Sequence, residues 1–154
     1  MRSIYKIVVC SLLTLSITSC EKDLLEKEQY QKEIYLIGAY NRVWTTEVSY
    51  SDEEVKTYFT VSSSGTLALD QDVNVKMKIN EELVDIYNKK YWTVLNEDKY
   101  YKSLDTDLYS IPSLENTVIK HAEGISAEVP VLIKTASLKI DQSYVIPVEI
   151  ESTT

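Results

Sequence analysis

Apolar and polar residues alternate along four stretches of the chain, as expected for β-strands with one buried face. Residues 73–79 show the pattern most clearly, because Val73, Val75, Met77 and Ile79 are separated by asparagine and lysine. Successive side chains of a strand point to opposite faces, so this stretch predicts a half-buried strand. The same alternation predicts strands at residues 55–61, 125–133 and 144–150.

Three other stretches predict strands without a strict alternation. Residues 34–40 are apolar on both faces and predict a buried strand, residues 44–50 are a second candidate, and residues 117–120 are a possible short strand. Proline has no amide hydrogen to donate to a neighbouring strand. Pro130 and Pro147 therefore each predict a sheet edge or a bulge within their strand.

One short amphipathic helix is predicted directly after residues 73–79. Asn80 is a favourable N-cap, and two glutamates follow it in the first turn, where negative charge interacts favourably with the helix dipole. The helix is expected to end near residues 88–90. Its predicted apolar face consists of Leu83, Ile86 and Tyr87.

The order of these elements predicts the fold class. Six to eight strands with one short helix are typical of an antiparallel β-sandwich of immunoglobulin-like type. We therefore predict a mostly β fold with a single domain over residues 34–154, a length that can bury a sizeable core.

The first 19 residues have the features of a secretory signal peptide. Two basic residues near the start precede an apolar run at residues 7–17, which is too short for a membrane span of about 20 residues. Residues 17–20 (Ile-Thr-Ser-Cys) resemble a bacterial lipobox, after which cleavage exposes an acylated N-terminal cysteine. The resemblance implies lipidation of Cys20. A secreted protein with an incidental cysteine is the alternative.

Residues 20–33 are expected to tether the lipid to the folded domain, because they are strongly charged and contain few aliphatic side chains. The acidic residues after Cys20 also resemble the surface-export signal of Bacteroidota lipoproteins. This resemblance implies an outer-membrane lipoprotein displayed at the cell surface. Cys10 is the only other cysteine and lies in the signal peptide, so no internal disulfide is expected.

The formal charge of −8 narrows the range of partners. Binding to nucleic acid requires basic surface to neutralise phosphates, so nucleic acid is not an expected partner. Electrostatic adhesion to anionic lipid is disfavoured for the same reason. Attachment to the membrane is therefore expected through the acyl chains on Cys20 alone.

Catalytic and metal-binding patterns are weak. His121 is the only histidine, and its position beside the predicted turn at Glu123-Gly124 indicates a surface residue rather than a general base. Residues 70–81 have the acidic spacing of a calcium loop, but Val75 stands where the loop requires glycine. We therefore expect no enzymatic activity, no bound metal and no cofactor.

Tyrosine is unusually frequent, with 12 tyrosines against two tryptophans and one phenylalanine. Tyrosine favours surfaces that are apolar on one side and wet on the other, and sugar rings stack on such aromatic faces. Several aromatic residues lie in the least regular part of the sequence, where binding loops are common. The alternative is that they cover the ends of the sandwich or a strand edge. The candidate ligand-binding residues are Tyr91, Trp92, Tyr100, Tyr101 and Tyr109.

Three segments resemble the family called domain of unknown function 1735, found at the N-terminus of Bacteroidota surface lipoproteins. They are residues 70–79 leading into 83–88, a turn followed by a strand at 121–129, and a closing strand at 144–150. The resemblance implies a sandwich domain on a lipoprotein, often near glycan-utilisation systems. Family members commonly carry a further domain, such as a family 18 glycosidase, whose D-x-x-D-x-D-x-E signature this sequence lacks.

The sequence thus predicts a non-catalytic cell-surface lipoprotein domain that binds a glycan or supports glycan capture in a polysaccharide-utilisation system. A structural or adaptor domain that contacts another outer-membrane protein is the alternative, since an exposed sheet edge can pair with a partner strand.

Overall fold

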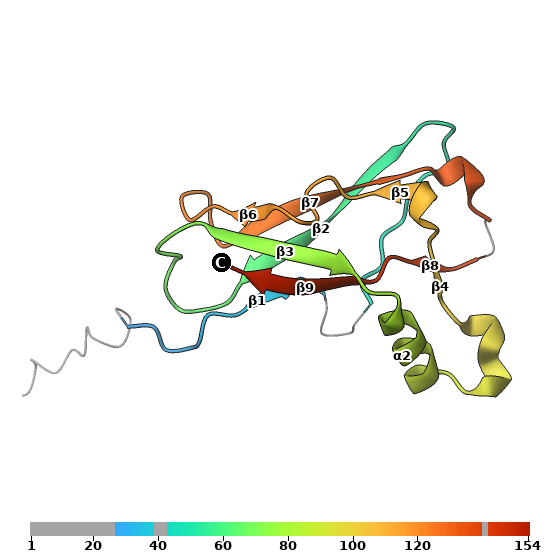
Figure 1. The fold of residues 1–154 in the computed structure, drawn as a ribbon, viewed down its shortest axis with the longest axis horizontal. Coiled ribbons are helices and arrows are strands. Elements are labelled where there is room, and N and C mark those ends of the chain that lie inside the picture. The colour runs from blue at the N-terminus through green and yellow to red at the C-terminus, as the bar shows by residue number, and fades with distance from the viewer. Residues whose placement is uncertain (1–26, 39–42, 140–141) are drawn as a thin grey trace, which may run out of the picture.

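The computed structural model describes residues 27–38, 43–139 and 142–154 (Figure 1). Two sheets form the body of the molecule. One has the strand order β1-β2-β7-β5 and the other β6-β3-β9, and all pairings within them are antiparallel. A short parallel pair, β4-β8, is separate from both. The strands are β1 Ile34–Leu36, β2 Val55–Ser63, β3 Val73–Ile79, β4 Lys102–Ser103, β5 Tyr109–Ser110, β6 Thr117–Ile119, β7 Ser126–Ile133, β8 Tyr144–Val145 and β9 Val148–Thr153.

The main core forms between the two larger sheets, because alternate side chains of each sheet point inward. Val61 of β2 and Val129 of β7 pack together with Val75 and Met77 of β3 and Ile119 of β6, and each is at most 1% exposed. Burying a side chain of this size contributes about 1.5–3 kcal/mol. This cluster holds the two layers of the sandwich together.

A second, smaller core extends the sandwich toward the parallel pair β4-β8. Leu104, Val131 and Ile133 are buried there, each at most 8% exposed, and Tyr109 and Tyr144 pack against them. The residues between β4 and β5, including a short 3₁₀ helix at Thr106–Leu108, thereby attach to β7.

The predicted mostly β sandwich with one short helix is confirmed within the described residues. The stretches predicted from alternation at 55–61, 73–79 and 125–133 form β2, β3 and β7. Beside Pro130, β7 pairs only with β2, because β5 reaches no further than Leu132. Pro130 therefore lies at a sheet edge, as its missing donor requires. The last predicted strand is interrupted at Pro147, which separates β8 from β9.

One predicted strand is shorter and more exposed than expected, and another does not form. The chain turns at Gly38, which has φ +85°, so β1 spans only three residues of the stretch predicted as a buried strand. Tyr35 on the edge strand β1 is 43% exposed, and Ile37 in the turn that follows is 46% exposed. No strand forms at residues 44–50. Instead, Trp44 packs against Gly38, where an added Cβ would lie only 3.1 Å from its indole ring.

The predicted signal peptide, Cys20 and residues 20–26 lie outside the described residues. The described part of the predicted tether is attached to the loop between β2 and β3. The Glu28 carboxylate accepts hydrogen bonds from two backbone N–H groups of this loop, and the Lys32 ammonium donates to a loop carbonyl at 2.6 Å. Gly65 in this loop has φ +126°, and a Cβ there would lie 2.9 Å from Lys32 Cγ. Glycine thus permits the close approach of the two segments.

Candidate functional site

The helix α2, Glu82–Tyr91, begins one residue later than the sequence predicts, with Glu81 rather than Asn80 at the N-cap position. The Oδ1 atom of Asn80 accepts the backbone N–H of Glu82 at 3.2 Å, which satisfies one of the free donors at the start of a helix. Acidic residues occupy the first turn and two lysines occupy the last, an arrangement that complements the helix dipole. The helix therefore separates negative charge at one end from positive charge at the other.

The predicted apolar face of α2 is wrong by one position. Val84 and Asn88 are the buried residues, with 8% and 4% exposure, whereas Leu83 and Ile86 are 36% and 52% exposed. Asn88 explains the difference. Its Nδ2 donates to the carbonyl of Tyr101 at 2.9 Å, and its Oδ1 accepts the backbone N–H of Tyr101 at 3.0 Å. This double hydrogen bond fixes the segment after the helix against α2.

Three tyrosines form an aromatic cluster along this contact. The ring of Tyr87 lies 4.5 Å from the ring of Tyr91 and 5.6 Å from the ring of Tyr101, measured between centroids. Burial raises the pKa of Tyr87, and the neighbouring Tyr101 and Tyr91 add to the effect. Tyr87 is not among the predicted ligand-binding residues. Its position four residues before Tyr91 is the sequence signal, because such residues share a helix face.

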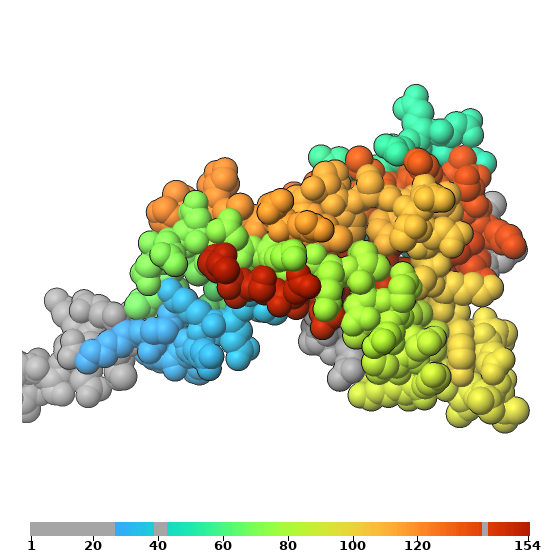
Figure 2. Space-filling view, in the orientation of Figure 1, coloured from blue at the N-terminus to red at the C-terminus, as the bar shows by residue number. Residues whose placement is uncertain are grey.

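An open depression of about 330 Å³, which we call the aromatic groove, lies at the C-terminal end of α2. Its walls come from the last turn of α2, the start of the 3₁₀ helix Val94–Lys99 and the residue that follows. Figure 2 shows α2 and the next segment, in green and yellow, projecting together from one end of the molecule. The lining residues are Lys89, Lys90, Tyr91, Trp92, Thr93, Val94 and Tyr100.

Two lysine ammonium groups lie over aromatic rings at this groove. The Nζ of Lys90 is 5.4 Å from the ring centroid of Tyr91, and the Nζ of Lys99 is 5.6 Å from that of Trp92. Such cation–π contacts are favourable by roughly 0.5–1 kcal/mol at exposed sites. The indole Nε1 of Trp92 is buried and has no hydrogen-bond acceptor among the described residues. The groove thus combines aromatic faces, positive charge and an unsatisfied donor.

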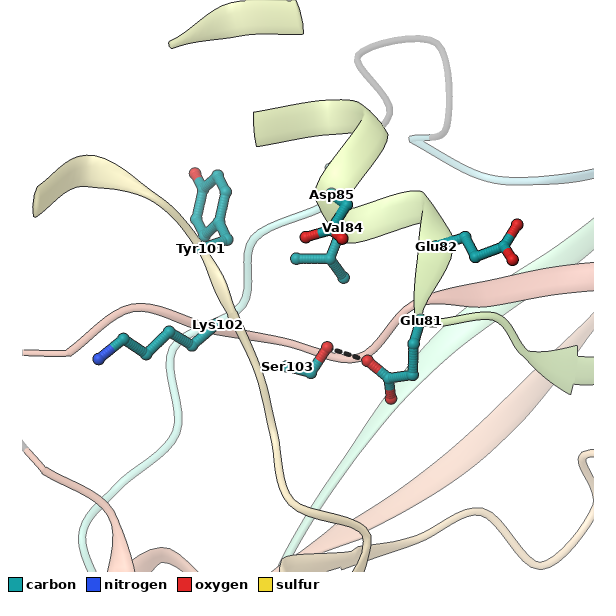
Figure 3. Close-up of a pocket in the computed structure, with 7 residues that line it drawn as sticks. All are labelled: Glu81, Glu82, Val84, Asp85, Tyr101, Lys102 and Ser103. Carbon is teal, nitrogen blue, oxygen red and sulfur yellow. Dashed lines mark hydrogen bonds between the residues drawn. The ribbon is translucent and has the colours of Figure 1, made fainter. Parts of the chain in front are cut away.

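A second depression, of about 420 Å³, lies at the other end of α2 (Figure 3). Glu81, Glu82 and Asp85 line it from the helix side, and all three are exposed. The segment with β4 forms the opposite wall, where the Ser103 hydroxyl donates a hydrogen bond to the Glu81 carboxylate. We call this site the acidic depression. The remaining lining residues are Val84, Tyr101 and Lys102.

Three of the five predicted ligand-binding residues line the aromatic groove: Tyr91, Trp92 and Tyr100. Tyr101 lines the acidic depression and contacts the groove only through the tyrosine cluster. Tyr109 lies apart in β5, where it packs against the second core and burial raises the pKa of its phenol. The structure therefore brings together the aromatic residues nearest to α2 and leaves Tyr109 in a structural position.

His121 lies in the turn after β6, with its side chain half exposed. Its Nδ1 is 2.6 Å from Oδ1 of Asp72, one of the residues with calcium-loop spacing. Within the described residues, no group of three or more His, Cys, Asp or Glu side chains is positioned to hold a metal ion. A search of the same residues finds no helix with the length and apolarity needed to cross a membrane.

Comparison with known proteins identifies the family. A family model described as a "-like, N-terminal domain" matches residues 30–154. The chain belongs to this family of N-terminal domains. None of the curated proteins matches the chain.

Two solved structures from Bacteroides ovatus share the fold. A multidomain protein including DUF1735 superposes with a TM-score of 0.59 at 17% identity, over 67% of this chain and 34% of that protein. A protein of unknown function gives a TM-score of 0.58 at 14% identity, over 79% of this chain and 40% of that protein. The chain thus spans less than half the length of either protein, and the likeness concerns the fold.

Proposed function

We propose that this chain is a non-catalytic, lipid-anchored domain that captures glycans at the aromatic groove. The observation that carries the proposal is the convergence of Tyr91, Trp92 and Tyr100 on one open groove. Aromatic side chains with an apolar face and a polar edge suit sugar rings, whose C–H groups pack on the face while their hydroxyls form hydrogen bonds. A volume of about 330 Å³ lies at the lower end of the range for small-molecule sites.

The polar atoms at the groove support a hydroxyl-rich ligand. Lys89 and Lys90 line it and carry several donors each, which a sugar hydroxyl can accept. The buried Nε1 of Trp92 lacks an acceptor among the described residues, and leaving such a donor unpaired costs about 1–3 kcal/mol. A small displacement of the indole on binding would let a ligand oxygen satisfy this donor.

Binding without hydrolysis is the favoured activity. A glycosidase needs two carboxylates on opposite sides of the scissile bond, one of them held as an acid by a water-excluded environment. The carboxylates of Glu81, Glu82 and Asp85 gather at the acidic depression, where all three are exposed to water. None of these three residues lines the aromatic groove.

The proposed location follows from the sequence. A lipid on Cys20 would hold the domain at the outer membrane, and the acidic residues that follow resemble a surface-export signal. At the cell surface, a capture domain would raise the local concentration of glycan for a neighbouring complex.

A glycan array probed with the full-length chain, purified in detergent, tests the proposal. Tyr91→Ala should weaken binding roughly tenfold, because it removes one stacking face. Tyr58→Ala is the matched control, since Tyr58 is 49% exposed on the four-stranded sheet and Tyr91 is 48% exposed. Trp92→Ala should weaken binding further. If neither groove variant changes the affinity of a bound glycan, the groove is not the site.

An adaptor function is the second candidate, and one observation favours it. Val94 and Leu95 at the start of the 3₁₀ helix are 75% and 89% exposed, which is unusual for neighbouring apolar residues unless a protein partner covers them. Leu95 does not line the groove. Leu95→Ser should therefore abolish cross-linking to an outer-membrane neighbour while leaving glycan binding intact. Loss of glycan binding alone would instead assign Leu95 to the sugar site.

A further inference from the structure

Within the described residues, some lysines have carboxylate partners and others do not, and the unpaired lysines away from the groove are Lys56, Lys102, Lys134 and Lys139. The lysines around the aromatic groove are also unpaired, and two of them lie over aromatic rings. In the body of the fold, Lys76 lies 2.7 Å from Glu151, and Lys120 lies 2.8 Å from Glu123. Lys32 and Lys78 are also within 4 Å of carboxylates. In the described part of the chain, none of Lys89, Lys90 and Lys99 has a carboxylate partner at this distance.

The position of these three lysines is not explained by helix stability alone. Lys89 and Lys90 occupy the last turn of α2, where positive charge complements the helix dipole. Lys99 belongs to the next element, the 3₁₀ helix, and still places its ammonium over the ring of Trp92. Glu97 and Asp98 lie on the same short helix, and neither forms an ion pair with Lys99. Unpaired positive charge therefore gathers at the groove from two separate elements.

This positive charge stands out because the chain is acidic overall, with a formal charge of −8. The acidic side chains of α2 lie in its first turn and line the acidic depression instead. A helix rises 1.5 Å per residue, so Glu82 lies about 10–12 Å along the axis from Lys89 and Lys90, beyond the Debye length of about 8 Å at physiological salt. Asp85 lies about one turn from Lys89 and offsets part of its charge, whereas Lys90 and Lys99 have no carboxylate within 4 Å in the described residues.

We propose that the aromatic groove selects acidic glycans, whose sugars carry a carboxylate or sulfate group. A sugar ring packed against Tyr91 or Trp92 would bring its anionic group within reach of an ammonium that already lies over the ring, Lys90 or Lys99 respectively. Binding would exchange a weak cation–π contact for a charge-assisted hydrogen bond, which is the stronger interaction. The inference rests on the proposed function, because it names the class of glycan that the same groove takes.

The test compares acidic glycans with matched neutral ones, using the full-length chain in detergent. The array carries uronate-, sialate- and sulfate-bearing glycans beside neutral glycans. Each acidic hit is measured again after carboxyl reduction or desulfation, which keeps the sugar linkages and removes the charge. We expect hits among the acidic glycans, with binding lost after one of the two treatments. The effective treatment distinguishes a carboxylate ligand from a sulfate ligand.

Two double variants that remove the same charge test whether the groove lysines bind the anionic group. K90Q/K99Q should weaken binding about tenfold for each lysine, as expected when a hydrogen bond to a charged group is lost. K56Q/K139Q removes the same charge at exposed lysines away from the groove and should leave the affinity unchanged. All four side chains are exposed, so thermal unfolding should be similar in both variants.

The outcomes separate the two proposals. Hits on neutral glycans that depend on Tyr91, with no effect of K90Q/K99Q, would overturn the selectivity for acidic glycans and leave the capture function standing. Equal loss in K90Q/K99Q and K56Q/K139Q would show that only net charge matters, which also overturns the assignment to the groove. Absence of any hit by the folded chain would overturn the capture function, and the acidic selectivity with it.

Discussion

Asp72 joins two parts of the chain that lie far apart in the sequence. Its Oδ1 accepts the backbone N–H of His121 at 3.0 Å and lies 2.6 Å from the His121 Nδ1. Asp72 immediately precedes β3, and His121 follows β6, the strand that pairs with β3. The contact therefore closes the turn after β6 onto the start of β3, using the carboxylate that the calcium-loop spacing would have offered to a metal.

This contact predicts a pH-dependent contribution to stability. The hydrogen bonds from His121 hold the pKa of Asp72 below its ordinary value. A carboxyl group with a lowered pKa in the folded state stabilises the fold above its unfolded pKa, and this contribution is lost as the pH falls through the folded value. Asp72→Asn should therefore lower the free energy of unfolding at neutral pH, and the deficit should shrink as the pH falls through the lowered pKa of Asp72.

Urea unfolding of both proteins across this pH range measures the effect. Asp52→Asn serves as the control, because Asp52 is exposed before β2 and forms no ion pair with the described residues. A deficit of Asp72→Asn that stays constant from neutral to acid pH would contradict the prediction, since it would not depend on the charge of the carboxylate.

Among the elements, the strands with strict alternation are those that the sequence predicts well. In β3 and β7, every second residue is apolar because one face packs in the core and the other faces water. Residues 34–40 and 44–50 are apolar for other reasons. Tyr35 lies on the edge strand β1, Ile37 lies in the turn after it, and Trp44 packs on Gly38. The apolar composition of these stretches therefore does not show whether their side chains make such contacts or belong to a buried strand.

Local sequence patterns also do not predict which face of α2 is buried, because a polar residue determines it. Helical periodicity selects Leu83 and Ile86 as the apolar face, yet the helix buries Asn88 to bind the backbone of Tyr101. The candidate aromatic residues could be predicted as a group from their irregular surroundings. The sequence does not predict which of these aromatic residues contact one another, because these contacts depend on the hydrogen bonds between Asn88 and a residue 13 positions later.

Asn88→Ala is predicted to open the aromatic groove by releasing the segment after α2. The substitution removes both hydrogen bonds to Tyr101 and leaves its backbone N–H and carbonyl without their partner. A buried polar group left unsatisfied costs about 1–3 kcal/mol, so the free energy of unfolding should fall by about that amount. Asn116→Ala, at an exposed asparagine before β6, should change it by less than about 0.5 kcal/mol.

Glycan affinity adds a readout that a purely structural residue would not affect. Tyr100 lines the groove and directly precedes Tyr101, so loss of the Asn88 contact should misplace it and weaken binding even under conditions where the variant is fully folded. Wild-type affinity in folded Asn88→Ala would mean that the groove keeps its shape without this contact.

At the scale of the whole molecule, the two ends of the long axis differ in role. The described chain begins at one end, where residues 27–33 attach to the loop between β2 and β3 (Figure 1). The helix α2 and the aromatic groove lie toward the opposite end. Under the proposed function, an anchor that precedes residue 27 would leave the groove at the end of the described fold that is remote from residues 27–33.

Cys20→Ala tests the anchor separately from the groove. Acyl chains attach a protein to a bilayer through burial of CH₂ groups, each contributing about 0.8 kcal/mol, and the acidic chain offers little electrostatic attraction to anionic lipid. The variant should therefore move from the membrane fraction to the soluble fraction, and from the detergent phase to the aqueous phase in a phase-partition assay. Its affinity for a glycan in solution should equal that of the wild type, because residue 20 is not among the residues that line the groove. Cys10→Ala is the control, since it changes a cysteine within the predicted signal peptide and should leave membrane attachment intact.

Continued membrane association of Cys20→Ala would contradict lipidation at this residue. A parallel loss of glycan binding would contradict the separation of anchor and groove.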